Sequence, residues 1–145
     1  MAETSNIAQM AEKVSKEIFS EFFWDKVGSI DTNWNCCQQK KHNKTTHPTD
    51  IVFRYEDPYE QKYININFDL KSYAKGSITT TTIRTALESL SMASECTQIS
   101  EEWQNIYQSK TMNTDIVSSL FVYNHDNSFD KDFDKTFLKR CRAYD

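Results

Sequence analysis

The stretch HPTDIVFRYEDPYEQKYININFDLKSY, residues 47–73, contains two runs with the composition of β-strands on either side of a short polar turn. The first run, DIVFRY, is rich in β-branched and aromatic residues, and in the second, YININFDL, apolar and polar residues alternate. The intervening EDPYEQK contains Pro58 and is short enough to pair the two strands antiparallel. The sequence therefore predicts a β-hairpin here.

This pairing predicts a cluster of charged residues at the end of the hairpin away from the turn. Asp50 opens the first strand and would lie beside the end of the second, where Asp69 and Lys71 point to one face because they are two positions apart. Two carboxylates, with the backbone carbonyl of Leu70, suit a hard divalent cation such as Mg²⁺. A neighbouring ammonium can assist an attacking water and offset charge on a phosphate. The pattern is coherent with phosphodiester hydrolysis.

The N-terminal segment has the spacing of an amphipathic helix. Between Ser5 and Lys26 the apolar residues recur every three or four positions, with Ser5 as the expected N-cap and Gly28 as the expected stop. Glu17 lies near the middle of this predicted helix and Glu21 one turn later. We expect one of them to face the sheet edge, and the distance from Gly28 favours Glu17 over Glu21.

The remaining segments predict an α/β domain. Residues 30–37 form a weak strand candidate followed by a polar loop, and residues 77–98 fit a long helix. A short helix capped by Ser100, an apolar strand over 115–126 that is expected to be central, and a C-terminal helix complete the order. With one chain of 145 residues and no linker, residues 1–145 are expected to form a single domain.

This element order and two short motifs resemble the PD-(D/E)XK nuclease superfamily, whose restriction-endonuclease-like core is αβββαβ. The motifs are Pro48-Thr49-Asp50, with one residue inserted between the proline and the acid, and Asp69-Leu70-Lys71. The resemblance covers roughly residues 5–125. It implies an α/β fold with a mixed central sheet flanked by helices.

The resemblance also implies roles for individual residues. Asp50, Asp69 and the Leu70 carbonyl would bind Mg²⁺ or Mn²⁺, Lys71 would assist the nucleophilic water, and Glu17, or alternatively Glu21, would support the metal. The implied activity is a metal-dependent endonuclease or exonuclease with DNA as substrate, acting in restriction or anti-phage defence. The alternative is a nuclease-fold module without catalysis, acting in nucleic-acid binding or complex assembly.

Acid-x-Lys triplets arise by chance, so the motif has a competing interpretation. Glu60-Gln61-Lys62 is a second such triplet, but it lies in the predicted turn and lacks a partner acid in an upstream strand. The plain alternative for Asp69 and Lys71 is a surface salt bridge at a strand end, which contributes little stability.

Basic residues predict local contacts with nucleic acid. The net charge of −4 and the pI of about 5.4 argue against binding by bulk electrostatics. Near the second long helix, phosphate oxygens are expected to meet Lys75, Ser77 and Arg84, although Arg84 and Glu88 also fit an intrahelical ion pair. The other basic cluster in the candidate interface comprises Lys40, Lys41 and Lys44.

Several other residue types have weaker functional interpretations. Four residues have the side-chain chemistry of zinc ligands: Cys36, Cys37, His42 and His47. Adjacent cysteines are poor partners for one tetrahedral ion, and no second CxxC or HxxxH appears, so His47 is expected instead to support the loop that delivers Asp50. A nucleophile pair of Cys96 with His125 has no supporting context. Three tryptophans are expected to be core residues rather than base-stacking platforms: Trp24, Trp34 and Trp103.

The N-terminus lacks a basic n-region and an apolar h-region, and no apolar run reaches about 18 residues. We therefore expect a cytoplasmic protein without membrane contact, with its four cysteines reduced. Because the chain ends inside a predicted amphipathic helix, we also expect a longer natural protein, a homodimer or a partner subunit in a larger complex.

Overall fold

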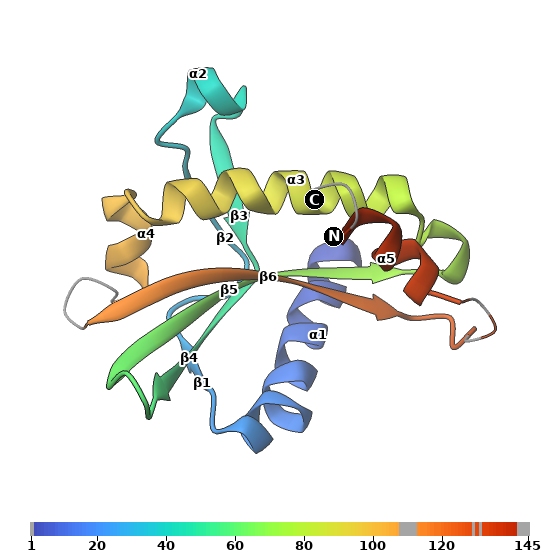
Figure 1. Ribbon diagram of the computed structural model, residues 1–145, viewed down its shortest axis with the longest axis horizontal. Helices are drawn as coiled ribbons and strands as arrows, with labels where there is room; N and C mark the ends of the chain where they lie inside the picture. The colour runs from blue at the N-terminus through green and yellow to red at the C-terminus, as the bar shows by residue number, and fades with distance from the viewer. Residues whose placement is uncertain (1, 108–112, 129, 131, 142–145) are drawn as a thin grey trace.

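The computed structural model describes residues 2–107, 113–128, 130 and 132–141, with side chains for residues 9–107, 113–128, 130 and 132–137. Its central sheet has the strand order β1-β4-β5-β6, and a separate two-stranded sheet pairs β2 with β3 (Figure 1). The strands are β1 (Asp25–Val27), β2 (Thr32–Asn35), β3 (Thr46–Thr49), β4 (Ile51–Asp57), β5 (Lys62–Tyr73) and β6 (Thr114–Asn124).

The predicted hairpin is confirmed as β4 and β5. The two strands pair antiparallel, with Ile51 opposite Phe68 at one end and Asp57 opposite Lys62 at the turn. On the other side, β5 pairs parallel with β6, so the central sheet is mixed. The fold is therefore the predicted α/β architecture with helices flanking a mixed sheet.

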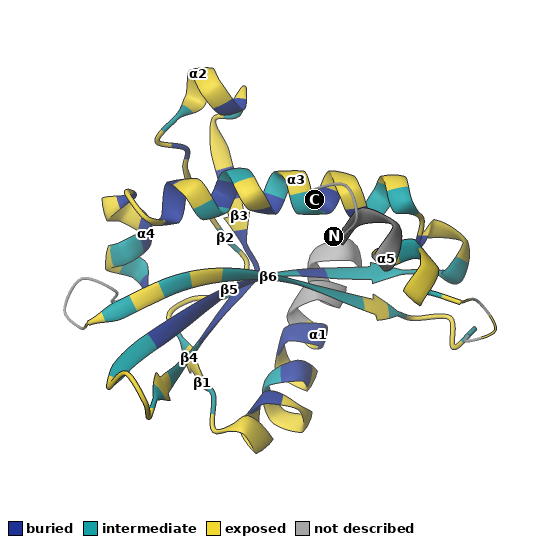
Figure 2. Ribbon diagram, viewed as in Figure 1, coloured by how far each residue is buried: buried dark blue, intermediate teal, exposed yellow. Residues whose placement is uncertain are grey.

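Helices cover the two faces of the sheet (Figure 1). One face packs against α1 (Ala2–Glu17) and the 3₁₀ turn η1 (Phe19–Phe22), and the other lies beneath α3 (Thr80–Thr97) and α4 (Glu101–Ile106). Buried residues are concentrated in the central strands β4 and β5 (Figure 2). The core on the α1 side contains Met10, Ala11, Val14, Phe19, Ile51, Phe53, Ile64, Ile66, Phe68 and Leu70.

The first helix differs from its prediction at both ends. It begins at Ala2, before the expected cap, and ends at Glu17, so Glu17 is its last residue and not its middle. The chain then turns through η1 and a left-handed Phe23 (φ 57°), which lets Trp24 stack on Phe19 at 4.8 Å between ring centroids. Burial of these aromatic rings against the sheet ends the helical path, although their spacing fits a helix.

Gly28 does not end a helix but allows a close contact. It has a φ of +67°, and a Cβ atom there would lie 2.6 Å from Cδ1 of Tyr107. The predicted strand over 30–37 is confirmed as β2. The prediction of a polar loop after this strand was incomplete, because the segment also contains α2 (Gln39–His42) and β3.

The later helices agree with their predictions. Thr79 caps α3 by accepting a hydrogen bond from Thr82 N–H at 3.2 Å, and Ser100 caps α4 through Trp103 N–H at 3.1 Å. A 3₁₀ turn, η2 (Lys75–Ser77), precedes α3, and α5 (Asp134–Cys141) follows β6. Within the described residues, no helix is both long and apolar enough to cross a membrane.

The prediction that the last strand is central is wrong, because β6 lies at an edge of the sheet. Its apolar residues serve two different faces: Ile116 packs against the core beneath α3 and α4, and Phe121 packs against the α1 side. Val117 remains 45% exposed. A strand with apolar contacts on both faces resembles a central strand in sequence, although β6 is last in the strand order of the described residues.

Candidate active site

Asp50 lies at the junction of β3 and β4, directly opposite Asp69. Because Ile51 pairs with Phe68, the next step of the antiparallel register brings Asp50 against Asp69. The side chain of Asp50 is buried, and its Oδ2 accepts a hydrogen bond of 2.6 Å from the backbone N–H of Leu70. The backbone of Asp50 also accepts from Asp31 N–H at 2.8 Å. The junction holds this carboxylate at the end of β5.

The residue before Asp50 is fixed by two buried tryptophans. Thr49 Oγ1 accepts hydrogen bonds from the indole N–H groups of Trp34, at 3.0 Å, and of Trp103, at 3.1 Å. Both tryptophans are almost fully buried, which confirms them as core residues. One hydroxyl therefore satisfies two buried donors and fixes the approach to Asp50.

We expect Thr49→Val to destabilise the fold by about 2 kcal/mol or more, because it leaves two buried indole N–H groups without an acceptor. Urea unfolding followed by tryptophan fluorescence measures this change. Thr49→Ser keeps the hydroxyl and is the matched control, with a much smaller expected loss. Equal stability of the Val and Ser variants would show that the hydroxyl does not contribute.

Asp69 and Lys71 point to the α3 side of the sheet. Leu70 belongs to the core beneath α1, and neighbouring residues in a strand point to opposite faces. The Lys71 ammonium lies 2.9 Å from Asp69 Oδ1, and the Asp69 side chain is only 13% exposed. This pair is therefore more enclosed than the exposed surface salt bridge that the alternative interpretation of the motif predicts.

The two carboxylates influence each other. The pKa of Asp50 is raised to about 6, chiefly by burial and also by the charge of Asp69 and a hydrogen bond with it, against the opposing effects of Leu70 N–H and Lys71. Burial alone would lower the pKa of Lys71, but its hydrogen bond to Asp69 and the charges of both acids raise the pKa overall. The three groups therefore form one electrostatic unit.

A cavity of about 450 Å³ opens beside this unit. Asp69, Lys71 and Tyr73 line one wall, and residues of α3 line the other. The α3 wall comprises Thr81, Thr82, Thr85, Ala86 and Ser89. These hydroxyl residues are not among the site residues predicted from the sequence, and the run of threonines at 79–82 is the signal in the sequence that points to them.

The structure does not bring Glu17 to Asp50, Asp69 and Lys71. Glu17 lines a different cavity, of about 390 Å³, together with Ser72 and Phe121 on the α1 side of the sheet. Glu21 is exposed in η1. The prediction put both glutamates in one long helix, whereas Glu17 ends α1 and Glu21 lies in η1, and the sequence could not show which face of the sheet α1 covers.

The basic residues predicted to contact nucleic acid are divided between two places. Lys44 contacts the cavity wall, since its ammonium donates to Ser89 Oγ at 2.7 Å, while Lys41 pairs with Glu95 at 2.5 Å. Lys40 is exposed on α2. At the start of α3, Lys75 pairs with Asp130 at 2.6 Å. Ser77 and Arg84 are exposed nearby.

The second acid-x-Lys triplet lies at the hairpin turn, as the sequence predicts. Lys62 forms ion pairs with Glu60 and, at 2.6 Å, with Asp115 of β6. Lys62 is the first residue of β5, and Asp69 and Lys71 lie toward the other end of the same strand. This triplet therefore provides an internal control for the acid-x-Lys motif.

Comparison with known families gives a match over nearly the whole chain. The sequence model of the family described as GAPS4 protein PD-(D/E)XK nuclease domain matches residues 1–143. Nucleases of the PD-(D/E)XK type generally use divalent metal ions, and a nuclease domain implies contact with nucleic acid. Comparison with the curated proteins and with the solved structures gives no match. The match spans nearly the whole chain, and the protein belongs to the GAPS4 PD-(D/E)XK nuclease domain family.

Proposed function

We propose that this nuclease domain hydrolyses phosphodiester bonds in DNA, using Mg²⁺ or Mn²⁺ held by Asp50, Asp69 and the Leu70 carbonyl. The observation that carries the proposal is the pairing of two carboxylates at one strand end, with Lys71 beside them and a cavity in front. Oxygen donors of this kind fit a hard divalent cation. Burial, together with the nearby charge of Asp69, raises the pKa of Asp50 to about 6, and a bound cation would favour the charged form of both acids.

Each residue has a separate role in the proposed reaction. Asp50 and Asp69 bind the cation and orient it, and the N–H of Leu70 keeps the Asp50 carboxylate in place. Lys71 stays protonated at neutral pH because its pKa is raised, so it donates hydrogen bonds to the attacking water or to a phosphate oxygen. When bound, the cation supplies Lewis-acid polarisation of the phosphate and acidifies a bound water.

The α3 wall gives the substrate a polar surface. Threonine hydroxyls donate to phosphate oxygens, and Lys44 lies against Ser89 at the same wall. We place the phosphate backbone along this wall, with Lys40, Lys41, Lys75, Ser77 and Arg84 as further contacts. Anti-phage defence is the proposed setting, since the family name is associated with it.

The proposal is tested with labelled single-stranded DNA, double-stranded DNA and RNA incubated with the purified chain and Mg²⁺ or Mn²⁺. We expect cleavage of a DNA substrate that requires the added cation. Absence of cleavage of all three substrates with either cation, by a folded protein, would favour the non-catalytic module. Cleavage restricted to RNA would support the proposed phosphodiester hydrolysis but contradict DNA as the substrate.

Asp50→Asn is expected to stabilise the protein at neutral pH in buffer without added divalent cation. The ordinary pKa of 3.8 is raised to about 6 in the folded state. Between these two pH values the folded protein retains a proton on Asp50 that the unfolded chain has released, and above them the folded state must hold a buried charge. Stability from this group is therefore full below pH 3.8 and is lost as the pH rises through about 6. An asparagine keeps an acceptor for Leu70 N–H and carries no charge.

Urea unfolding at about pH 4 to about pH 8 measures this effect. The stability advantage of Asp50→Asn over the wild type should be small at the acidic end and should grow as the pH rises. Asp25→Asn, at an exposed position of β1, is the control and should not show this trend. An advantage that instead grows toward acidic pH would contradict the proposed environment of Asp50.

A further inference from the structure

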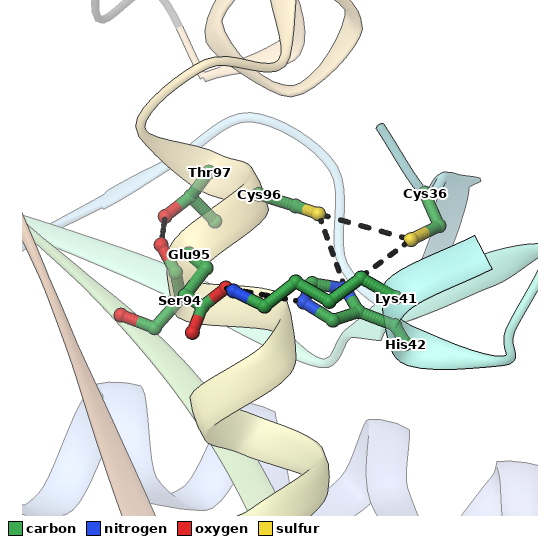
Figure 3. A network of polar contacts seen from close by, with 7 residues as sticks. All are labelled: Cys36, Lys41, His42, Ser94, Glu95, Cys96 and Thr97. Carbon is green, nitrogen blue, oxygen red and sulfur yellow. Dashed lines mark hydrogen bonds and ion pairs between the residues drawn. The ribbon is translucent and has the colours of Figure 1, made fainter. Parts of the chain in front are cut away.

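Four buried side chains with metal-binding chemistry meet between α3 and the β2–β3 sheet. They are Cys36, His42, His47 and Cys96, and their ligand atoms all lie within 4.8 Å of one another. Figure 3 shows three of them, with Cys96 on α3 pointing toward Cys36 and His42. Cys37, the neighbour that the sequence suggested as a ligand, is exposed and outside the cluster.

The spacing of the donor atoms matches a tetrahedral zinc site. Zinc bonds of about 2.3 Å to sulfur and about 2.0 Å to nitrogen place two sulfurs about 3.8 Å apart, and a sulfur and a nitrogen about 3.5 Å apart. The two Sγ atoms of Cys36 and Cys96 are separated by 3.8 Å. The Nδ1 of His42 lies 3.4 Å from Cys36 Sγ and 3.6 Å from Cys96 Sγ.

The polar groups around the cluster also indicate a ligand. His47 is fully buried at 0% exposure, and neither of its ring nitrogens has a hydrogen-bond partner among the described residues. A buried polar atom without a partner is costly, and a metal bond would satisfy one of these nitrogens.

The second nitrogen of His42 has the environment of a metal-bound histidine. His42 Nε2 lies 3.2 Å from Glu95 Oε2, and the same oxygen pairs with Lys41 (Figure 3). Histidines that ligate metals commonly donate their other N–H to a carboxylate, which orients the ring. Glu95 therefore acts as a positioning residue for His42.

We propose that Cys36, His42, His47 and Cys96 form a structural Zn²⁺ site. Two thiolates and two imidazoles complete a tetrahedral shell, so no position remains for a substrate. The ligands differ from the carboxylates of the nuclease site and would select zinc rather than Mg²⁺. The site joins α3 to the β2–β3 sheet.

This zinc site would support the nuclease site without touching the substrate. His47 lies in β3, which leads directly through Thr49 to Asp50. On the other side, Cys96 anchors the C-terminal part of α3, whose N-terminal half lines the cavity beside Asp69. The metal would therefore fix α3, one wall of the cavity, relative to the strand that leads to Asp50.

Elemental analysis of the chain tests the proposal after purification on a support without immobilised metal. We expect stoichiometric zinc in the wild type and in Cys37→Ser, the matched control, and loss of zinc in Cys36→Ser and Cys96→Ser. Glu95→Gln should retain the ligands but bind zinc about 10-fold or more weakly in a competition titration with a chromogenic chelator.

Cobalt substitution of the wild type keeps the test independent of whether cysteine variants fold. Co²⁺ in place of zinc should give the intense visible bands of a tetrahedral ion and a thiolate charge-transfer band in the near ultraviolet. Folded wild-type protein with neither zinc nor a tetrahedral Co²⁺ spectrum would overturn the proposal. A Cys36–Cys96 disulfide in peptide mass spectra, or zinc retained by folded Cys96→Ser, would overturn it as well.

Discussion

Asp69→Asn is expected to reduce metal-dependent cleavage by on the order of 10³-fold or more, while the protein stays folded. The substitution preserves the shape of the side chain but removes the Asp69 carboxylate, which lines the cavity beside Lys71, and leaves Asp50 as the one acid of the pair. It also removes the anion that holds the Lys71 ammonium at 2.9 Å. Under the proposed mechanism, we therefore expect metal binding and the placement of Lys71 to be lost together. Single-turnover cleavage of a labelled substrate at saturating Mg²⁺ measures the loss.

Glu60→Gln is the matched control for this experiment. It makes the same chemical change in the other acid-x-Lys triplet, whose lysine pairs with Glu60 and Asp115 at the hairpin turn. We expect wild-type cleavage rates from this variant. Equal losses in both variants, or full activity of folded Asp69→Asn, would place the chemistry elsewhere in the chain.

Trp103→Ala is expected to produce the largest loss of stability, about 3–5 kcal/mol. The side chain is fully buried, packs against Tyr107 at 4.8 Å between ring centroids, and donates to Thr49 Oγ1 at 3.1 Å. Its removal opens a cavity beneath α4 and takes away one of the two hydrogen bonds that fix the approach to Asp50. Cleavage should therefore fall at temperatures where the variant is still folded.

Equilibrium urea unfolding measures this prediction, with Tyr59→Ala as the control. Tyr59 is 94% exposed in the hairpin turn, and its removal should change the free energy of unfolding by no more than about 0.5 kcal/mol. A loss below about 1 kcal/mol for Trp103→Ala would contradict the packing described for α4.

The hairpin and its charged end could be predicted from the sequence because local signals determine both. Alternation in β5 and a short turn set the antiparallel register, and the register alone brings Asp50 beside Asp69. The same logic separated the Glu60-Gln61-Lys62 triplet from the candidate site. These inferences need no knowledge of how distant segments pack.

Other features depend on packing between distant segments, and here the predictions failed or were incomplete. The position of Glu17 depends on which face of the sheet α1 covers, and the helix end depends on aromatic contacts of Phe19 with Phe53 and Phe68. The spacing of apolar residues in α1 predicts neither the face of the sheet that the helix covers nor the residue at which it ends. The edge position of β6 likewise follows from strand order and not from composition.

The cysteine and histidine cluster shows the same limit. Cys36, His42 and His47 are close in sequence, but Cys96 reaches them only because α3 packs across the β2–β3 sheet. The adjacent Cys37 offered a nearer partner and is directed to solvent. Short spacing motifs identify zinc sites whose ligands are local, and this cluster has one ligand that is not.

A crystal soaked with Mn²⁺ tests the central claim most directly, through an anomalous difference map. The proposal predicts a peak contacted by the carboxylates of Asp50 and Asp69 and by the Leu70 carbonyl, with Lys71 beside it and no peak in crystals of Asp69→Asn. A Mn²⁺ peak bound only at other residues, or unchanged in Asp69→Asn, would contradict the assignment of this strand end as the metal centre of the nuclease.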